Sequence, residues 1–142
     1  MRTAYVESSA IAAWLLDQPG GWPAFEAIRD ADAVISSALT LVECERTLRR
    51  SVAVQDMSSS RADLLRAEFR TVASAWNIVA IGPEVVARAR EGYPDDRIRA
   101  LDAIHLATAL TARVSFEDIV VVTLDDRIRG NATALGFEVL PV

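Results

Sequence analysis

Apolar residues along this chain follow two spacings, one typical of short buried strands and one typical of helices. Runs such as Val120–Val122 and Ile78–Val79 are continuously apolar, which is typical of strands that are buried on both faces. Leu41, Cys44 and Leu48 recur at helical spacing, which predicts a helix with one buried side. Strands that alternate with helices predict an α/β fold, in which helices cover both faces of a parallel sheet.

Five strands and seven helices are expected in alternation. The expected strands are residues 3–6, 33–36, 77–81, 119–123 and 137–140. The expected helices are residues 8–16, 22–29, 38–52, 60–75, 83–92, 101–112 and 126–135. Ser8 or Ser9 is the expected N-cap of the first helix, and Ser60 is the expected N-cap of the fourth. Because the chain has the length of one ordinary domain and no long linker or repeat, we expect residues 1–142 to form a single domain.

The charge balance argues against generic binding of nucleic acid. Fifteen arginines and no lysine are set against twenty acidic residues, which gives a net charge of −5. Binding that rests on neutralising phosphates needs an excess of basic residues. A cluster of metal-binding acids would also make the net charge negative, and bound cations would then offset its repulsion of phosphate. The negative charge therefore does not exclude a nuclease. Arginine forks suit phosphate groups, although codon bias in an alanine-rich chain also explains the missing lysines.

Segments that direct a chain to a membrane or out of the cell are not expected here. No apolar run approaches the ~18–20 residues that span a bilayer. Glu7 and Asp17 interrupt the stretch that follows Arg2, unlike the apolar region of a signal peptide. Cys44 is the single cysteine, so neither an internal disulfide nor a thiolate zinc site is expected. These features predict a cytoplasmic protein with no membrane partner.

Four acidic residues stand where a ligand site of a parallel α/β fold is expected. Glu7 and Asp125 directly follow strands, Glu43 lies in an apolar part of a helix, and Asp102 lies near the start of another helix. The carboxyl ends of parallel strands meet at one edge of the sheet, where such folds bind ligands. Four carboxylates there would repel one another unless cations intervene, and oxygen ligands select Mg²⁺ or Mn²⁺. Such a site can activate water and bind the oxygens of a phosphodiester.

Each acid also has a local structural role open to it. Asp102 suits the first turn of a helix, where the helix dipole favours an acid by ~0.3–1 kcal/mol. Asp125 could cap the helix that follows it, and Glu43 could pair with Arg46 or Thr47 one turn away. For each acid taken singly, the structural role explains its position as well as a catalytic role does. The convergence of all four acids at one edge is what favours a cation site.

Five segments of the chain together resemble PIN-domain ribonucleases, most closely the VapC toxins of bacterial toxin–antitoxin pairs. They are residues 4–10, 35–43, 101–110, 122–127 and 134–137. The resemblance implies a three-layer α/β/α PIN-like domain with a central parallel sheet. It also implies a metal-dependent endoribonuclease that uses Mg²⁺ or Mn²⁺, acts on RNA, forms a homodimer and is neutralised by a cognate antitoxin. In this interpretation the chain is the toxin of such a pair.

The resemblance assigns functional roles to six positions. The family's acids fall on Glu7, Glu43, Asp102 and Asp125, while Ser8 and Thr123 match small polar residues that support the acids. Glu7 departs from the family pattern, which has Asp there, and Glu is also a poor helix cap. Mg²⁺ demands near-ideal octahedral geometry, and a misplacement of about 1 Å can cost ~10²-fold in rate. Three explanations are open: Glu7 ligates through a water or a shifted rotamer, the site is naturally attenuated, or Asp was replaced to lower toxicity.

Other polar residues have weaker signals. His105 is the only histidine, and on so apolar a helix it is typical of a hydrogen-bonded core residue, with Asp102 three residues away as one partner. Two groups of arginines could line an RNA path or simply solvate helix faces. They are Arg46, Arg49 and Arg50 in one helix and Arg61, Arg66 and Arg70 in the next.

Two other functional classes were weighed against a nuclease. A catalytically silent PIN domain would act by binding RNA or its antitoxin without metal-dependent turnover. A phosphoacceptor protein, such as a receiver domain or a haloacid-dehalogenase-like phosphatase, also places acids at strand ends. Those families rely on a lysine near the phosphoryl group, and this chain has none, which counts against the phosphoacceptor class.

Overall fold

Five parallel strands form one sheet in the computed structural model, which describes residues 1–142. The strands are β1 (Thr3–Val6), β2 (Ala33–Ser37), β3 (Asn77–Val79), β4 (Ile119–Val122) and β5 (Glu138–Leu140). Their order across the sheet is β3-β2-β1-β4-β5, so the central strand β1 lies between β2 and β4. Along the chain, β2 and β3 are added on one side of β1, and then β4 and β5 are added on the other side. Ligands of open α/β sheets bind where the strand order reverses in this way, which here is between β1 and β4.

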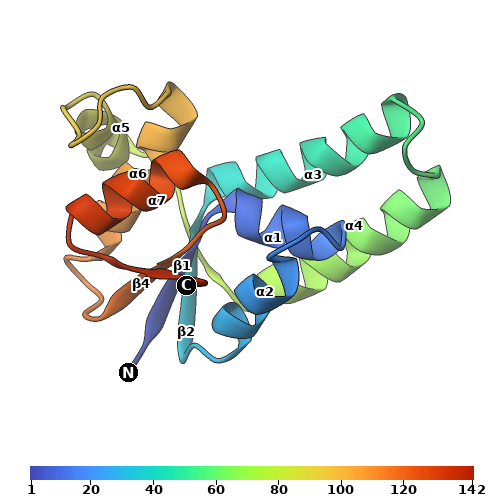
Figure 1. The fold of residues 1–142 in the computed structure, drawn as a ribbon, viewed down its shortest axis with the longest axis horizontal. Coiled ribbons are helices and arrows are strands. Elements are labelled where there is room, and N and C mark those ends of the chain that lie inside the picture. The colour runs from blue at the N-terminus through green and yellow to red at the C-terminus, as the bar shows by residue number, and fades with distance from the viewer.

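Seven helices cover the two faces of the sheet. They are α1 (Ser8–Leu15), α2 (Gly21–Arg29), α3 (Ala38–Ala53), α4 (Ser59–Ala73), α5 (Pro83–Ala89), α6 (Ala100–Ala112) and α7 (Asp126–Ala134). Helices α1 to α4 lie on one side of the sheet and α5 to α7 on the other, which confirms the predicted three-layer α/β/α architecture (Figure 1). The hairpin of α3 and α4 extends away from the sheet (Figure 1). None of the helices combines the length and the apolar character needed to cross a bilayer.

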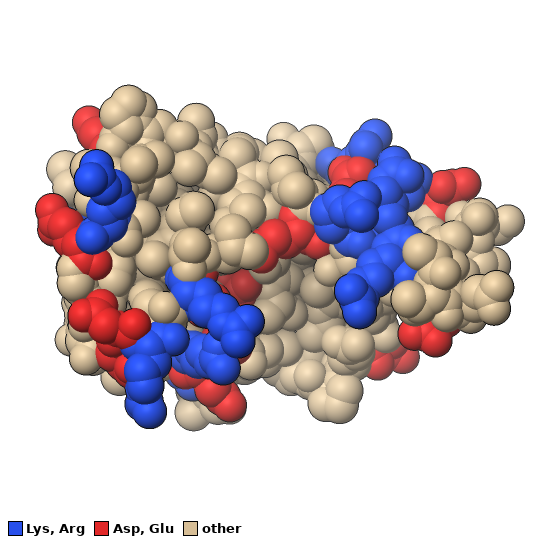
Figure 2. Space-filling view, turned by 90° about the horizontal axis from the view of Figure 1, so that it is seen from above, with Lys and Arg blue, Asp and Glu red and all other residues tan.

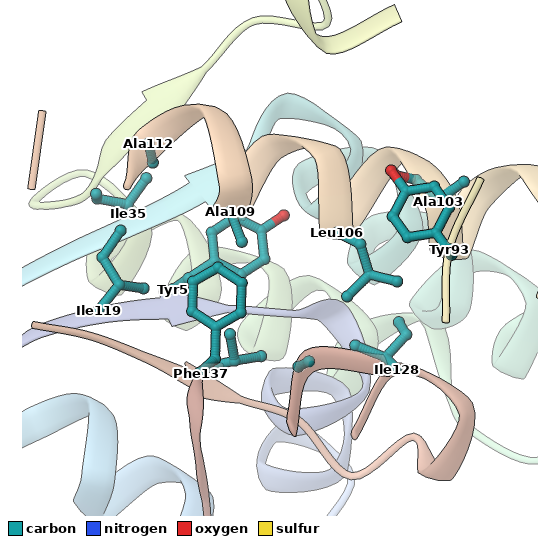
Figure 3. Packing of buried hydrophobic residues seen from close by; sticks show 12 residues of the cluster. Tyr5, Ile35, Tyr93, Ala103, Leu106, Ala109, Ala112, Ile119, Ile128 and Phe137 are labelled. Carbon is teal, nitrogen blue, oxygen red and sulfur yellow. The ribbon is translucent and has the colours of Figure 1, made fainter. Parts of the chain in front are cut away.

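The alternation of side chains along β1 divides the core into two clusters. Tyr5 packs with Leu106 of α6 and Ile128 of α7 on one face of the sheet (Figure 3). Ala4 and Val6 pack on the other face, in the cluster that also holds residues of α1 and α4. Neighbouring residues of a strand point to opposite faces, so both sides of β1 are buried. Continuous apolar runs were the sequence signal for such strands.

Element boundaries differ from the expectations at several ends. Strand β3 ends at Val79 rather than residue 81, because its partner β2 ends at Ser37 opposite Val79 and offers no further hydrogen bonds. The expected N-cap Ser60 is wrong: Ser58 caps α4 by accepting from the backbone N–H of Arg61. Helix α5 ends at Ala89, three residues before Gly92. The other elements agree to within a residue or two at each end.

Candidate active site at the carboxyl edge of the sheet

The carboxyl ends of β1, β2 and β4 are in register, so the residues that follow them lie together. Val6 is level with Ser36 and with Val122. Glu7 follows β1 directly and is buried, while Thr123 follows β4 and is also buried. Glu43 lies in the second turn of α3, which begins where β2 ends. Glu7, Glu43 and His105 each offer a ligand atom, and these atoms all lie within 4.8 Å of one another.

Glu7 is held by four hydrogen bonds, two on each carboxylate oxygen. Its Oε1 accepts from the hydroxyls of Ser9 and Thr123, the latter at 2.7 Å. Its Oε2 accepts from the Ser8 hydroxyl at 2.8 Å and from the Ser9 backbone N–H at 2.9 Å. A carboxylate has about four lone-pair sites, so all of them are used. The hydroxyls of Ser8 and Thr123 therefore both donate to Glu7.

Glu7 is also the N-cap of α1, which corrects the expectation of Ser8 or Ser9 at that position. Its backbone is extended, and its carboxylate accepts from the N–H of Ser9. The extra methylene of Glu lets the side chain fold back onto the first turn, where a negative charge is stabilised by the helix dipole. Sequence analysis undervalued this role because Glu rarely caps helices.

Glu43 is held on one oxygen only. Its Oε1 accepts from His105 Nε2 at 2.6 Å and lies 3.0 Å from the Ser8 hydroxyl, whose single proton bridges Glu43 and Glu7. Its Oε2 accepts no hydrogen bond. The alternative partners of Glu43 do not reach its carboxylate: Thr47 donates to the backbone carbonyl of Glu43, and Arg46 makes no ion pair.

Asp102 and Asp125 stand at helix starts beside this pair and are outside the 4.8 Å group. Asp102 Oδ2 accepts from the backbone N–H of Arg99 at the start of α6. Asp125 Oδ1 accepts from two backbone N–H groups as the N-cap of α7. The second oxygen of each accepts no hydrogen bond. The structure thus brings Glu7 and Glu43 together and gives Asp102 and Asp125 the capping roles that were open to them, with one oxygen of each left free.

Sequence analysis missed Tyr5, and it identified His105 as a hydrogen-bonded core residue but gave it the wrong partner, Asp102. His105 is only 2% exposed, and its Nε2 contacts Glu43 while its Nδ1 lies 2.9 Å from the Tyr5 hydroxyl. It makes no hydrogen bond to Asp102. Burial, and then the charge of Glu7, raise the pKa of Tyr5 well above its usual value, which keeps the phenol protonated. The sequence features that could have indicated these two residues were a tyrosine in an apolar strand and a histidine one helical turn after an acid.

Cys44 is adjacent to Glu43 in sequence but takes no part in the site chemistry. Its side chain is buried, and Sγ lies 3.8 Å from the carbonyl of Ser8. Burial, followed by the charges of Glu43 and Glu7, raises the pKa of the thiol far above its usual value. A thiol that stays protonated is neither a nucleophile nor a metal ligand.

Arginines flank the acidic centre of this edge. Figure 2 looks onto the carboxyl edge of the sheet and shows acidic side chains near the middle, with basic clusters on two sides. Arg46, Arg49 and Arg50 of α3 are exposed, make no ion pair and line one shallow hollow. Arg66 and Arg70 of α4 are instead paired with Glu45. The α3 arginines therefore form the free basic surface next to Glu43.

The donor set fits a hard divalent cation. The oxygens without a hydrogen bond, on Glu43, Asp102 and Asp125, are the ligands that Mg²⁺ and Mn²⁺ prefer. The two carboxylates of Glu7 and Glu43 repel each other at this distance, and a cation would offset that repulsion. The nitrogen atoms of His105 are both engaged in hydrogen bonds.

The sequence and the fold are similar to those of known proteins. The sequence model of a family described as PIN domain matches residues 4–133. Ribonuclease VapC35 of Mycobacterium tuberculosis is 34% identical over 135 residues, which cover 95% of this chain and 84% of that protein. Ribonuclease VapC46 of the same organism is 30% identical over 144 residues, with 99% and 98% covered. A toxin–antitoxin complex from Klebsiella pneumoniae has a similar fold, with a TM-score of 0.64 at 18% identity, covering 97% of this chain and 96% of the other.

Proposed function

Because the chain belongs to the PIN domain family and to its VapC-type ribonucleases, we propose that it is a metal-dependent endoribonuclease acting as the toxin of a toxin–antitoxin pair. The observation that carries the proposal is the pair of carboxylates at the strand-order reversal, formed by the buried Glu7 and the half-buried Glu43. In this function residues 1–142 act as one PIN domain. Glu7, Glu43, Asp102 and Asp125 form the metal centre, and Ser8 and Thr123 support Glu7.

The side chains of the proposed metal centre have different roles. When bound, Mg²⁺ or Mn²⁺ activates a water and stabilises the charge that develops on the phosphodiester. Glu43 Oε2, Asp102 Oδ1 and Asp125 Oδ2 are the free oxygens that would hold the ion. Glu7 holds the centre together through its hydroxyl donors and adds negative charge to it. No side-chain nucleophile is needed, in keeping with the buried, protonated thiol of Cys44.

The surroundings of the site suit an RNA substrate. Arg46 and Arg50 lie one and two turns beyond Glu43 on α3 and are unpaired, so they can contact phosphates of a strand that leaves the site. A cognate antitoxin that covers this edge and a second copy of the chain are the proposed protein partners. The proposed compartment is the cytoplasm, which suits a single reduced thiol.

A catalytically silent PIN domain is the second candidate, and one observation favours it. All lone-pair sites of Glu7 accept hydrogen bonds, so Glu7 can ligate an ion directly only by displacing a donor. Glu7→Asp shortens the side chain, which then cannot keep all four donors. An attenuated site predicts that this variant cleaves RNA faster than the wild type.

Cleavage of end-labelled RNA by the purified protein tests the proposal. With Mn²⁺ we expect specific fragments, which vanish with a chelator and with Glu43→Gln. Glu45→Gln is the matched control, because Glu45 lies two residues along the same helix and pairs with Arg70. Cleavage should survive that change. If neither the wild type nor Glu7→Asp cleaves any RNA, the silent PIN domain is the correct function.

A further inference from the structure

A chain of three side chains crosses the core behind the carboxylate pair. Tyr5 comes from β1, His105 from α6 and Glu43 from α3. The Tyr5 hydroxyl is 2.9 Å from His105 Nδ1, and His105 Nε2 is 2.6 Å from Glu43 Oε1. Tyr5 and His105 are each at most 2% exposed, so neither can exchange these partners for water. The three residues thus form a buried link between the central strand and the site.

The chemistry of the partners decides where the proton of this link lies. An ionised carboxylate only accepts hydrogen bonds, so at this distance His105 Nε2 must carry the proton. In the neutral ring Nδ1 is then an acceptor, and the Tyr5 hydroxyl donates to it. The ring is therefore fixed at both nitrogens.

We propose that Tyr5 and His105 are positioning residues for Glu43: Tyr5 holds the His105 ring in place, and His105 Nε2–H fixes Oε1 of Glu43. This leaves Glu43 Oε2, which accepts no hydrogen bond, as the ligand oxygen. The proposal rests on the proposed function only in taking Glu43 as a metal ligand. Groups that orient a ligand in this way commonly change metal affinity by 10–100-fold when they are removed.

Two substitutions of His105 separate positioning from packing. The amide of Gln reaches about as far as Nε2 and can donate to Glu43, whereas the amide of Asn reaches only as far as Nδ1. We expect the affinity for Mn²⁺, measured by calorimetric titration, to fall by about 10–100-fold in His105→Asn and by less than about tenfold in His105→Gln. Equal losses in both variants, or no loss in either, would overturn the proposal. Urea unfolding in a chelator checks that both variants fold.

A nitrogen NMR measurement tests the link without any metal. His105 is the only histidine, so ¹⁵N-labelled histidine reports one ring. We expect the proton on Nε2 in the metal-free wild type and still on Nε2 in Tyr5→Phe, which loses only the hydroxyl and keeps Glu43 as the acceptor. A ring without a proton on Nε2 in the wild type contradicts the proposal. If the wild type binds no Mn²⁺, the proposed metal centre fails, and the tautomer alone decides whether the link exists.

Discussion

Glu43→Gln is expected to make the metal-free protein more stable, although it removes a ligand of the proposed metal centre. The substitution keeps the shape of the side chain and leaves Oε1 able to accept from His105 and Ser8. It removes one of the two charges that Glu7 and Glu43 hold within 4.8 Å of each other. Whether the free energy of unfolding rises or falls depends on the repulsion that is removed and on the hydrogen bonds that are weakened.

The repulsion between the two carboxylates is the larger contribution. At 4.8 Å and an effective dielectric constant of about 20, two like charges repel by about 3.5 kcal/mol. Against this, two hydrogen bonds to a charged acceptor become bonds to a neutral one, which costs about 1 kcal/mol each. The free energy of unfolding in a chelator should therefore rise by about 1.5 kcal/mol in Glu43→Gln.

Urea unfolding near neutral pH measures the stability of the metal-free protein in a chelator and the stabilisation by Mn²⁺ when the ion is added. Mn²⁺ should stabilise the wild type by mass action and leave Glu43→Gln almost unchanged. Glu45→Gln is the control with the opposite sign, because the hydrogen bonds and charge of Arg70 lower the pKa of Glu45 and stabilise its ionised form. A Glu43→Gln variant less stable than the wild type in chelator would refute the account of a strained acidic pair.

Three further outcomes are expected. Glu7→Asp should lower the free energy of unfolding in chelator, because the shorter side chain no longer reaches all four donors, as thermal unfolding would show. The raised pKa of Cys44 means that only the unfolded thiol ionises above about pH 8.5, so the free energy of unfolding should fall by up to about 1.4 kcal/mol per pH unit there. That slope should be smaller in Cys44→Ala. Neutralising Arg46, Arg49 and Arg50 together should weaken RNA binding and flatten its dependence on salt, measured by fluorescence anisotropy.

The parts of the fold that depend on periodicity could be predicted from the sequence. Continuous apolar runs located β4 and β3, and alternation with helices predicted the parallel sheet and its two covered faces. The expected burial of both faces was wrong for β3, because it is an edge strand and Ile78 is exposed. From that topology followed the edge at which Glu7 and Glu43 meet. These features depend on local patterns and on general rules of chain connection, which one sequence contains.

Features that depend on contacts between distant segments could not be predicted. The end of β3 at Val79 depends on where its neighbour β2 stops, and the role of His105 depends on Tyr5, 100 residues earlier in the chain. Helical spacing suggested Asp102 as the partner of His105, whereas packing of α6 against β1 and α3 brings Tyr5 and Glu43 to its ring. The N-cap role of Glu7 was underrated because a general preference among residue types was applied to a side chain with three nearby hydroxyl donors.

The dependence of RNA cleavage on Mn²⁺ concentration tests the central claim most directly, when it is compared with Mn²⁺ binding to the same protein. If the acids of the carboxyl edge hold the ion that supports cleavage, the rate should be half-maximal at a Mn²⁺ concentration equal to the dissociation constant from calorimetry. Asp102→Asn should weaken binding and cleavage together. Cleavage that persists in a chelator, or binding that saturates without any cleavage, would contradict the claim.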